Sequence, residues 1–113
     1  MRVFISQPMS GLTDNDILKT RKEVIKCVEE NLSVKEGEEI EFIDSFFQSA
    51  PVDKQALWFL GKSLELLSTA DVCIFVGYWS EARGCVMEHE ACKRYGIPIK
   101  YAVYNMKNEL KII

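Results

Sequence analysis

The stretch DVCIFVGYWSEARGCVMEHEACKRYGIPIKY, residues 71–101, decides the fold of this chain. Residues 72–76 are apolar throughout, which is typical of a strand buried on both faces of a sheet. A glycine-containing loop separates them from a helical pattern over 84–95, which stops at Gly96. A further strand is predicted at 99–103. The stretch therefore predicts a strand, a helix and a strand in succession.

The residues before this stretch predict two more strands and two helices. Residues 2–6 (RVFIS) are typical of a buried strand, and residues 40–43 predict another. Between them, Thr13 is an N-cap ahead of acidic residues and predicts a helix of roughly five turns. A second amphipathic helix is predicted over residues 53–69. Its inner stripe consists of Leu57, Leu60, Leu64 and Leu67.

Strands that alternate with helices through short connections imply an α/β fold, with a mostly parallel sheet covered on both faces. The expected strand order is 2-1-3-4, and residues 104–113 form either an extra edge strand or a segment that packs on a neighbour. In this order the topological switch point lies between the first and third strands, where ligands bind at the carboxyl ends of strands. Two loops meet there, QPMSGL at 7–12 and GYWSEARG at 77–84.

The composition is that of one globular domain spanning residues 1–113, with 48% hydrophobic and 27% charged residues. The formal net charge of -3 disfavours binding to a nucleic acid polymer, which needs clustered cations. Neither a leader pattern nor an apolar run of membrane-spanning length is present, so we expect a cytoplasmic protein with no membrane partner. With one histidine and no CxxC pair, neither a metal nor a cofactor is expected. Reduced core thiols are predicted at Cys27, Cys73, Cys85 and Cys92.

Glu88 is the first candidate for chemistry. It falls about one turn into the helix over 84–95, on the face that carries Ala91, Cys92 and Tyr95, so it is expected to face the sheet. The helix macrodipole is expected to hold the carboxylate ionised, as a nucleophile or an electrostatic partner. The alternative is a glutamate that only stabilises its helix.

The start of the same helix offers further candidates. Arg83 and Gly84 supply a cation and backbone amides where a phosphate could sit, and Ser80 adds a hydroxyl. The alternative is a surface turn with an exposed arginine. The loop after the first strand can offer a ligand an amide side chain and free backbone groups, through Gln7, Pro8 and Met9.

Aromatic side chains are candidates for stacking on a nucleobase, because such stacking tolerates any base. They are Tyr78, Trp79 and Trp58, with core or dimer contacts as the alternative. His89 and Glu90 are predicted on the surface, although His89 beside a ligand can act as an acid or base. Asp71 precedes its strand, at the end of the sheet away from the site, and is interpreted as structural.

Three sequence patterns together resemble a known family. These are a strand ending in FIS-x-P-MSGL, a D-x3-FVGYW strand and loop, and S-x2-RG-x3-E-x2-A-x4-G-IP. They resemble the nucleoside 2-deoxyribosyltransferase-like superfamily, and within it the DUF4406 branch of bacteria and their phages. The similarity covers residues 1–99 and implies a flavodoxin-like or Rossmann-like three-layer sandwich, in agreement with the strand order above.

The characterised relatives are deoxyribosyltransferases and deoxynucleoside monophosphate N-glycosidases, in which a glutamate of a G-x3-E helix start attacks the anomeric carbon of a 2-deoxyribosyl group. The motif assigns this role to Glu88, with a glycosyl-enzyme intermediate resolved by water or by a second base. The resemblance also implies that the turn with Ser80 and Gly84 cradles the sugar 5′ group or its phosphate. The pocket is then lined by Gln7, Pro8 and Met9.

Two positions depart from the family pattern. The relatives carry an aspartate eight residues ahead of the one that begins the third strand, and counting back from Asp71 gives Ser63. A serine cannot ionise at neutral pH, so the resemblance leaves Ser63 a hydrogen-bonding role in catalysis. The relatives also have a glycine near Gln7, whose larger amide narrows the pocket.

The expected function is hydrolysis or transfer at the N-glycosidic bond of a nucleoside or nucleotide. One alternative is a non-catalytic pocket that captures a nucleotide-derived small molecule, such as a signal in a contest between phage and host. Another is an assembly protein with a vestigial pocket. A homodimer is expected, because Trp58 and Phe59 lie off the main stripe of the helix over 53–69.

Overall fold

The computed structural model describes residues 1–32, 35–45 and 55–113. It contains a five-stranded sheet in the order β2-β1-β3-β4-β5, in which β1 to β4 are parallel and β5 is antiparallel to β4. In chain order the elements are β1 (Arg2–Ser6), α1 (Asp14–Asn31), β2 (Glu41–Phe42), α2 (Ala56–Leu67), β3 (Val72–Val76), the 3-10 turn η1 (Trp79–Glu81), α3 (Arg83–Tyr95), β4 (Ile99–Tyr104) and β5 (Leu110–Ile112). The predicted α/β class and the order of the first four strands are confirmed.

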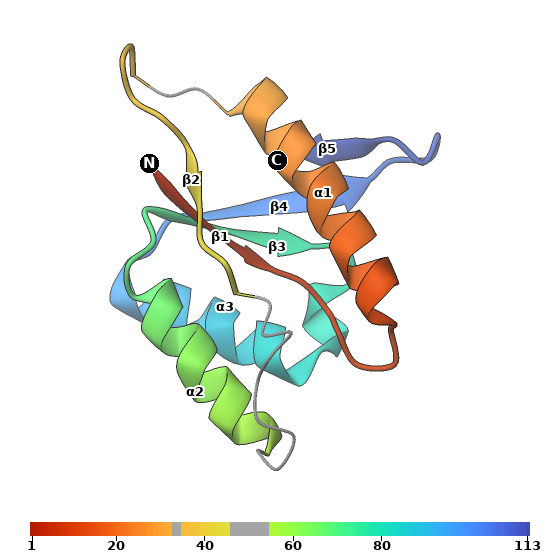
Figure 1. The fold of residues 1–113 in the computed structure, drawn as a ribbon, viewed down its shortest axis with the longest axis vertical. Coiled ribbons are helices and arrows are strands. Elements are labelled where there is room, and N and C mark those ends of the chain that lie inside the picture. Colours follow the sequence, from red (N-terminus) through yellow and green to blue (C-terminus); the bar gives the residue numbers. More distant parts are fainter. Residues whose placement is uncertain (33–34, 46–54) are drawn as a thin grey trace.

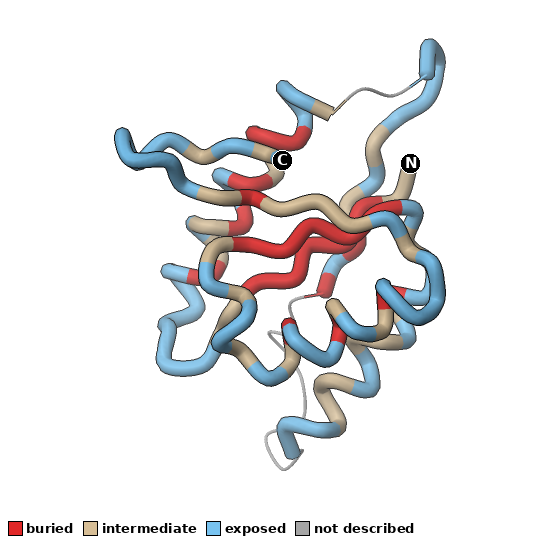
Figure 2. The backbone as a smooth tube through the Cα atoms, turned by 180° about the vertical axis from the view of Figure 1, so that it is seen from behind, coloured by how far each residue is buried: buried red, intermediate tan, exposed pale blue. Residues whose placement is uncertain are grey.

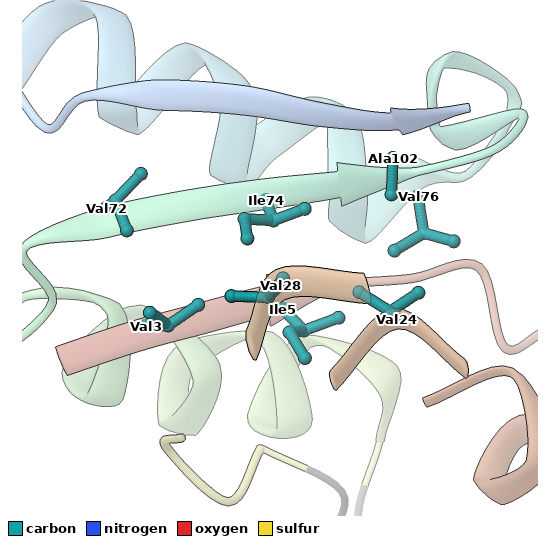
Figure 3. Packing of buried hydrophobic residues seen from close by; sticks show 8 residues of the cluster. All are labelled: Val3, Ile5, Val24, Val28, Val72, Ile74, Val76 and Ala102. Carbon is teal, nitrogen blue, oxygen red and sulfur yellow. The ribbon is translucent and has the colours of Figure 1, made fainter. Parts of the chain in front are cut away.

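The sheet lies between two layers of helix, with α1 on one face and α2 and α3 on the other (Figure 1). Side chains alternate along a strand, so β1 serves both layers. Figure 3 shows Val3 and Ile5 on the α1 side, packed with Val24 and Val28 of that helix. Phe4 faces the other way and packs in a second cluster, which includes Leu67 of α2.

The central strands form the most deeply buried part of the protein (Figure 2). All five residues of β3 are buried, as its unbroken apolar sequence predicts. β1 pairs with β3 from Val3 opposite Val72 to Ser6 opposite Phe75, so both strands end at the same edge of the sheet. The two loops that the sequence assigned to the switch point therefore leave from neighbouring strands.

The helix ends follow their sequence signals. α1 begins after Thr13, whose side chain accepts a hydrogen bond from the Asp16 backbone amide. The Asp16 carboxylate in turn accepts one from the Thr13 backbone amide. α3 begins at Arg83, one residue before the predicted start, and ends at Gly96, which has a φ of 74°. That left-handed conformation is the one a glycine adopts without a Cβ clash.

The predicted helix over residues 53–69 is shorter in the structure. α2 spans Ala56–Leu67, residues 53 and 54 lie outside the described ranges, and the helix is capped by Ser68. Leu57 was expected on the buried stripe but is 72% exposed. The helix contributes Leu67, its last residue, to the core, because only its C-terminal end is buried against the sheet.

The edges of the sheet also differ from the expectation. β2 is limited to Glu41–Phe42 rather than residues 40–43, although the Ile43 amide still donates to the Val3 carbonyl at 2.9 Å. The tail, left open by the sequence, forms β5 against β4. None of the helices in the described ranges combines the length and the apolar character that a membrane crossing requires.

Candidate functional site

Glu88 lies on the inner face of α3, as predicted, and is only 7% exposed. The hydroxyl of Ser6, the last residue of β1, donates a hydrogen bond of 3.2 Å to Glu88 Oε1. Ser6 has the same strand parity as Phe4, so its side chain is on the α2 and α3 face of the sheet. The site therefore joins the carboxyl end of β1 to α3, the helix that follows the neighbouring strand β3.

The expectation that the helix macrodipole keeps Glu88 ionised is wrong. Burial raises the pKa of Glu88 to about 7, while the hydrogen bond from Ser6 acts in the opposite direction. Glu88 is the sixth residue of α3, counted from Arg83, and the macrodipole acts chiefly within the first turn of a helix. Near neutral pH the carboxyl group is thus divided between its acid and base forms, as suits a proton-transfer group.

The face that carries Glu88 is narrower than the sequence indicated. Cys92, one turn on, is buried as predicted, but Tyr95 is 84% exposed because α3 has reached the end of the sheet there. All four cysteines are buried and unpaired. Burial raises the pKa of the neighbouring Cys85 thiol to about 11, opposed by the Ser6 hydroxyl, so this thiol is protonated at neutral pH.

His89 was predicted on the surface but is half-buried in an aromatic cluster. Its ring stacks on Trp79 with a centroid separation of 4.1 Å and an interplanar angle of 19°. His89 Nε2 lies 2.8 Å from the hydroxyl of Tyr101 on β4, and its ring meets Phe75 edge-on. Glu90, by contrast, is exposed and pairs with Arg94. The cluster fixes the loop after β3 against α3.

The three aromatic candidates have different surroundings. Trp79 is engaged with His89, whereas Tyr78 beside it is 82% exposed. Trp58 lies on α2, where its ring meets Phe59 edge-on with centroids 5.1 Å apart. Tyr78 is therefore the aromatic side chain of this loop that is open to a ligand.

The start of α3 has the open backbone that an anion requires. Its N-cap is Ala82, which has no side-chain oxygen to accept from the first amides of the helix. A Cβ placed on Gly84 would meet no atom within 4 Å, so a ligand can approach the backbone there. Arg83 and Ser80 are exposed beside it. These groups can bind a phosphate or another anion.

Gln7 faces away from Glu88. Its Nε2 donates to the Ile17 carbonyl of α1 at 3.1 Å, which puts the amide on the α1 side of the sheet. The side chain is 5% exposed, and its Oε1 accepts no hydrogen bond from the residues that the structure describes. Pro8 and Met9 follow at the rim and are partly buried. Gln7 thus holds the loop against α1. Its amide was expected to narrow the pocket around Glu88, but its hydrogen bond lies on the opposite side of the sheet.

Ser63 is half-buried on α2, and no hydrogen bond in the described part of the chain joins it to Glu88. The hydroxyl bound to Glu88 belongs to Ser6 instead, a residue that the sequence reasoning missed. The sequence did contain a signal for Ser6: it is a small polar residue at the end of an apolar strand, next to the switch point. Asp71 is structural as predicted, since its carboxylate accepts from the Arg2 amide at 2.7 Å at the opposite edge of the sheet.

Across the described residues, no group of three or more histidine, cysteine, aspartate or glutamate side chains is arranged to hold a metal ion. Comparison of the chain with models of protein families, with curated proteins and with solved structures finds no match in any of the three.

Proposed function

We propose that the protein acts on the N-glycosidic bond of a nucleoside or nucleotide, with Glu88 as the nucleophile, in the manner of the nucleoside 2-deoxyribosyltransferase-like superfamily. The observation that carries the proposal is a buried carboxyl group at the switch point, held by Ser6 and with a pKa raised to about 7. A glutamate with only a structural role would gain nothing from being buried, because burial lowers the folding stability whenever the carboxyl group ionises. Strongly perturbed groups of this kind cluster at functional sites.

In the proposed reaction Glu88 Oε2 attacks the anomeric carbon of the sugar while Ser6 holds Oε1. The bond from that carbon to the base nitrogen breaks, and its electron pair leaves with the base, which takes up a proton. Water then hydrolyses the glycosyl ester and restores the carboxylate. The amides at Gly84, with Arg83 and Ser80, bind the sugar 5′ group or its phosphate.

The test is to incubate the protein with a panel of deoxynucleosides and their monophosphates and to follow free base by chromatography. We expect base release that Glu88→Ala abolishes. Glu90→Ala is the matched control, because it removes a carboxylate from the exposed side of the same helix. Release that persists in Glu88→Ala, or no release from any member of the panel, contradicts the enzymatic proposal.

A second candidate function is capture of a nucleotide-derived small molecule without turnover. It is favoured by Ser63, which stands where the catalytic relatives have an ionisable aspartate, and by the half-protonated state of Glu88 near pH 7. A neutral carboxylic acid donates a hydrogen bond to a ligand but is a poor nucleophile. Calorimetric binding of a panel member without base release supports this function over the first.

We also propose that the protein is a homodimer through α2. Leu57 on this helix is 72% exposed, and the half-buried Trp58 and Phe59 are beside it. Sedimentation equilibrium should give the mass of two chains for the unchanged protein and of one chain for Leu57→Lys. Leu12→Lys is the control, since Leu12 is 49% exposed in a different part of the surface. A mass of one chain for the unchanged protein excludes the dimer.

A further inference from the structure

Glu88 and Arg21 are the two charged residues that are buried in the part of the chain that the structure describes. Arg21 on α1 donates from Nη2 to the Ile43 carbonyl at 2.7 Å and lies near the negative charge of Asp44. Glu88 has no such compensation, because none of the ion pairs in the described ranges includes it. A buried carboxylate without a nearby cation is costly, so this site is suited to a ligand that brings the positive charge itself.

One oxygen of the Glu88 carboxyl group is open to such a ligand. Oε1 accepts the hydrogen bond from Ser6, whereas Oε2 has no hydrogen-bond partner among the described residues. The described side-chain atoms that are both enclosed and unpaired are Gln7 Oε1 and Arg21 Nη1, so Glu88 Oε2 keeps some contact with solvent. A ligand can therefore reach Oε2 without displacing a protein group from it.

The polar groups packed around Glu88 are unsuitable as acids. They are one hydroxyl and three thiols, from Ser6, Cys73, Cys85 and Cys92. Each thiol is at most 3% exposed, and burial raises the pKa of Cys85 to about 11. A general acid must lie within hydrogen-bond reach of the group that it protonates and have a pKa near the working pH. These groups do not meet both requirements.

His89 follows Glu88 in the sequence but extends toward a different strand. Its Nε2 lies 2.8 Å from the Tyr101 hydroxyl on β4, whereas Glu88 reaches Ser6 on β1. β3 lies between these two strands. Burial and the charge of Lys93 lower the pKa of His89, so its imidazole is mainly neutral near pH 7. His89 is thus not a source of protons for a reaction at Glu88.

The need for an acid depends on the base that leaves. An uncharged purine or pyrimidine departs as an anion unless a proton is delivered while the glycosidic bond breaks. A cationic base, such as a pyridinium ring or an N7-alkylated purine, departs as a neutral molecule without taking up a proton. A site that has a nucleophile and no acid in reach is therefore matched to the second kind of bond.

We propose, building on the N-glycosidic function proposed above, that the substrate of Glu88 carries a cationic base, as an N-glycosyl pyridinium or an N7-alkylated purine nucleotide does. Glu88 Oε2 forms a bond to the anomeric carbon, the carbon–nitrogen bond breaks, and its electron pair neutralises the positive ring. Water then attacks the anomeric carbon, the ester bond returns its electron pair to Glu88, and one proton is released to solvent.

A cationic substrate also favours the reactive form of its nucleophile. Near neutral pH Glu88 is divided between its acid and base forms, because burial raises its pKa to about 7. An opposite charge within about 4 to 6 Å lowers the pKa of a carboxyl group by about 1 to 3 pH units. Binding of the cation should therefore convert Glu88 to the carboxylate that attacks the sugar.

The experiment compares two pairs of nucleotides that differ in the charge of the base. Nicotinamide mononucleotide is paired with its dihydro form, and 7-methyl-2′-deoxyguanosine monophosphate with 2′-deoxyguanosine monophosphate. Base release is followed by chromatography and corrected for the uncatalysed rate. We expect kcat/KM to be about 100-fold or more higher for the cationic member of at least one pair, which is the factor that a positioned acid normally supplies. The pair that responds identifies a pyridinium or an alkylated purine as the preferred base.

Variants of α3 connect this preference to Glu88. Glu88→Ala should abolish release from the cationic nucleotides. Glu90→Ala is the matched control and should retain it, because Glu90 is exposed on the same helix and pairs with Arg94. Release from the cationic nucleotides that persists in Glu88→Ala overturns the inference.

A binding measurement separates this inference from the catalytic one. Carbon-13 NMR follows the Glu88 carboxyl group during a pH titration with either 1-methylnicotinamide, which is cationic, or nicotinamide, which is neutral. The signal is assigned by its absence from Glu88→Gln. The cation should lower the Glu88 midpoint by about 1 pH unit or more, and nicotinamide should leave it unchanged.

The outcomes distinguish the two proposals. Equal or faster release from the neutral members of both pairs overturns the inference and leaves the N-glycosidic function intact. Release from none of the nucleotides overturns the N-glycosidic function, and the NMR titration then decides the preference for a cation by itself. Equal midpoints with both NMR probes, in a protein that does not favour the cationic nucleotides, exclude a cationic ligand at Glu88.

Discussion

Ser6 Oγ and Glu88 Oε1 lie 3.2 Å apart across 82 residues of sequence, at a point where both side chains are buried. The hydrogen bond between them opposes the effect of the surroundings: burial disfavours the ionised carboxylate, and the hydroxyl favours it. One small side chain at the end of β1 therefore tunes the acidity of a group on α3.

Removing that hydroxyl should make Glu88 a weaker acid. In Ser6→Ala the burial persists and the opposing hydrogen bond is lost, so the pKa of Glu88 should rise further above about 7. Carbon-13 NMR of the glutamate carboxyl groups measures the midpoint directly. Ser45→Ala is a suitable control, because Ser45 is also buried but donates to the Ile5 carbonyl. An unchanged midpoint in Ser6→Ala contradicts the assigned role of the hydrogen bond.

Folding stability should fall with rising pH because of Glu88. Its pKa rises from an ordinary 4.5 to about 7 in the folded protein, so the folded state binds the proton more tightly than the unfolded state. The stabilisation that this tighter proton binding provides is complete below pH 4.5 and is lost as the pH rises through 7. Between pH 5 and pH 8 the loss is on the order of 2 to 3 kcal/mol.

Urea unfolding of the unchanged protein and of Glu88→Gln at both pH values tests this loss. The glutamine variant lacks the titrating group, so its stability relative to the unchanged protein should increase from pH 5 to pH 8. If the difference between the two proteins is the same at both pH values, Glu88 does not titrate in this range.

The proposed catalysis should have the opposite pH dependence. A nucleophilic carboxylate must be ionised, so kcat/KM for base release should rise about tenfold per pH unit below the pKa of Glu88 and level off above about 7. In Ser6→Ala this rise should move to higher pH. A rate that falls with pH in this range would instead identify the protonated acid as the active form of Glu88.

The two ends of α2 should respond differently to truncation. Leu67 is 1% exposed and packs in the cluster with Phe4 and Phe75, so Leu67→Ala should cost about 2 to 5 kcal/mol of unfolding free energy. Leu57 is 72% exposed, so Leu57→Ala should change stability by about 0.5 kcal/mol or less in a single chain. Chemical unfolding at low protein concentration measures both. Similar losses at both positions would contradict the exposure of Leu57.

The fold was predictable because its signals are local. The apolar run of β3, the cap at Thr13 and the stop at Gly96 each specify an element boundary, and the short connections then imply the strand order. The periodicity of α2 was equally clear, yet it misassigned Leu57, because periodicity defines a helix face and does not tell how much of that face the sheet covers.

The candidate site was predictable only in part. The inward position of Glu88 follows from helical spacing, but its protonation depends on how deeply α3 packs and on Ser6, which is remote in sequence. His89 was misassigned because its partners, Trp79 and Tyr101, come from a loop and another strand. The burial of Arg21 also arises from tertiary contacts, since its neighbours on α1 are mostly charged.

The interior position of β1, between β2 and β3, also constrains how the protein is made. β1 precedes both of its neighbours in the chain, and the longer of them, β3, pairs with it from Val72 onward. During synthesis β1 (RVFIS) therefore cannot pair with β3 until residues 72–76 have left the ribosome. Folding is then governed by a contact between distant segments, so a ribosome that stalls before residue 72 leaves an apolar strand exposed to other chains.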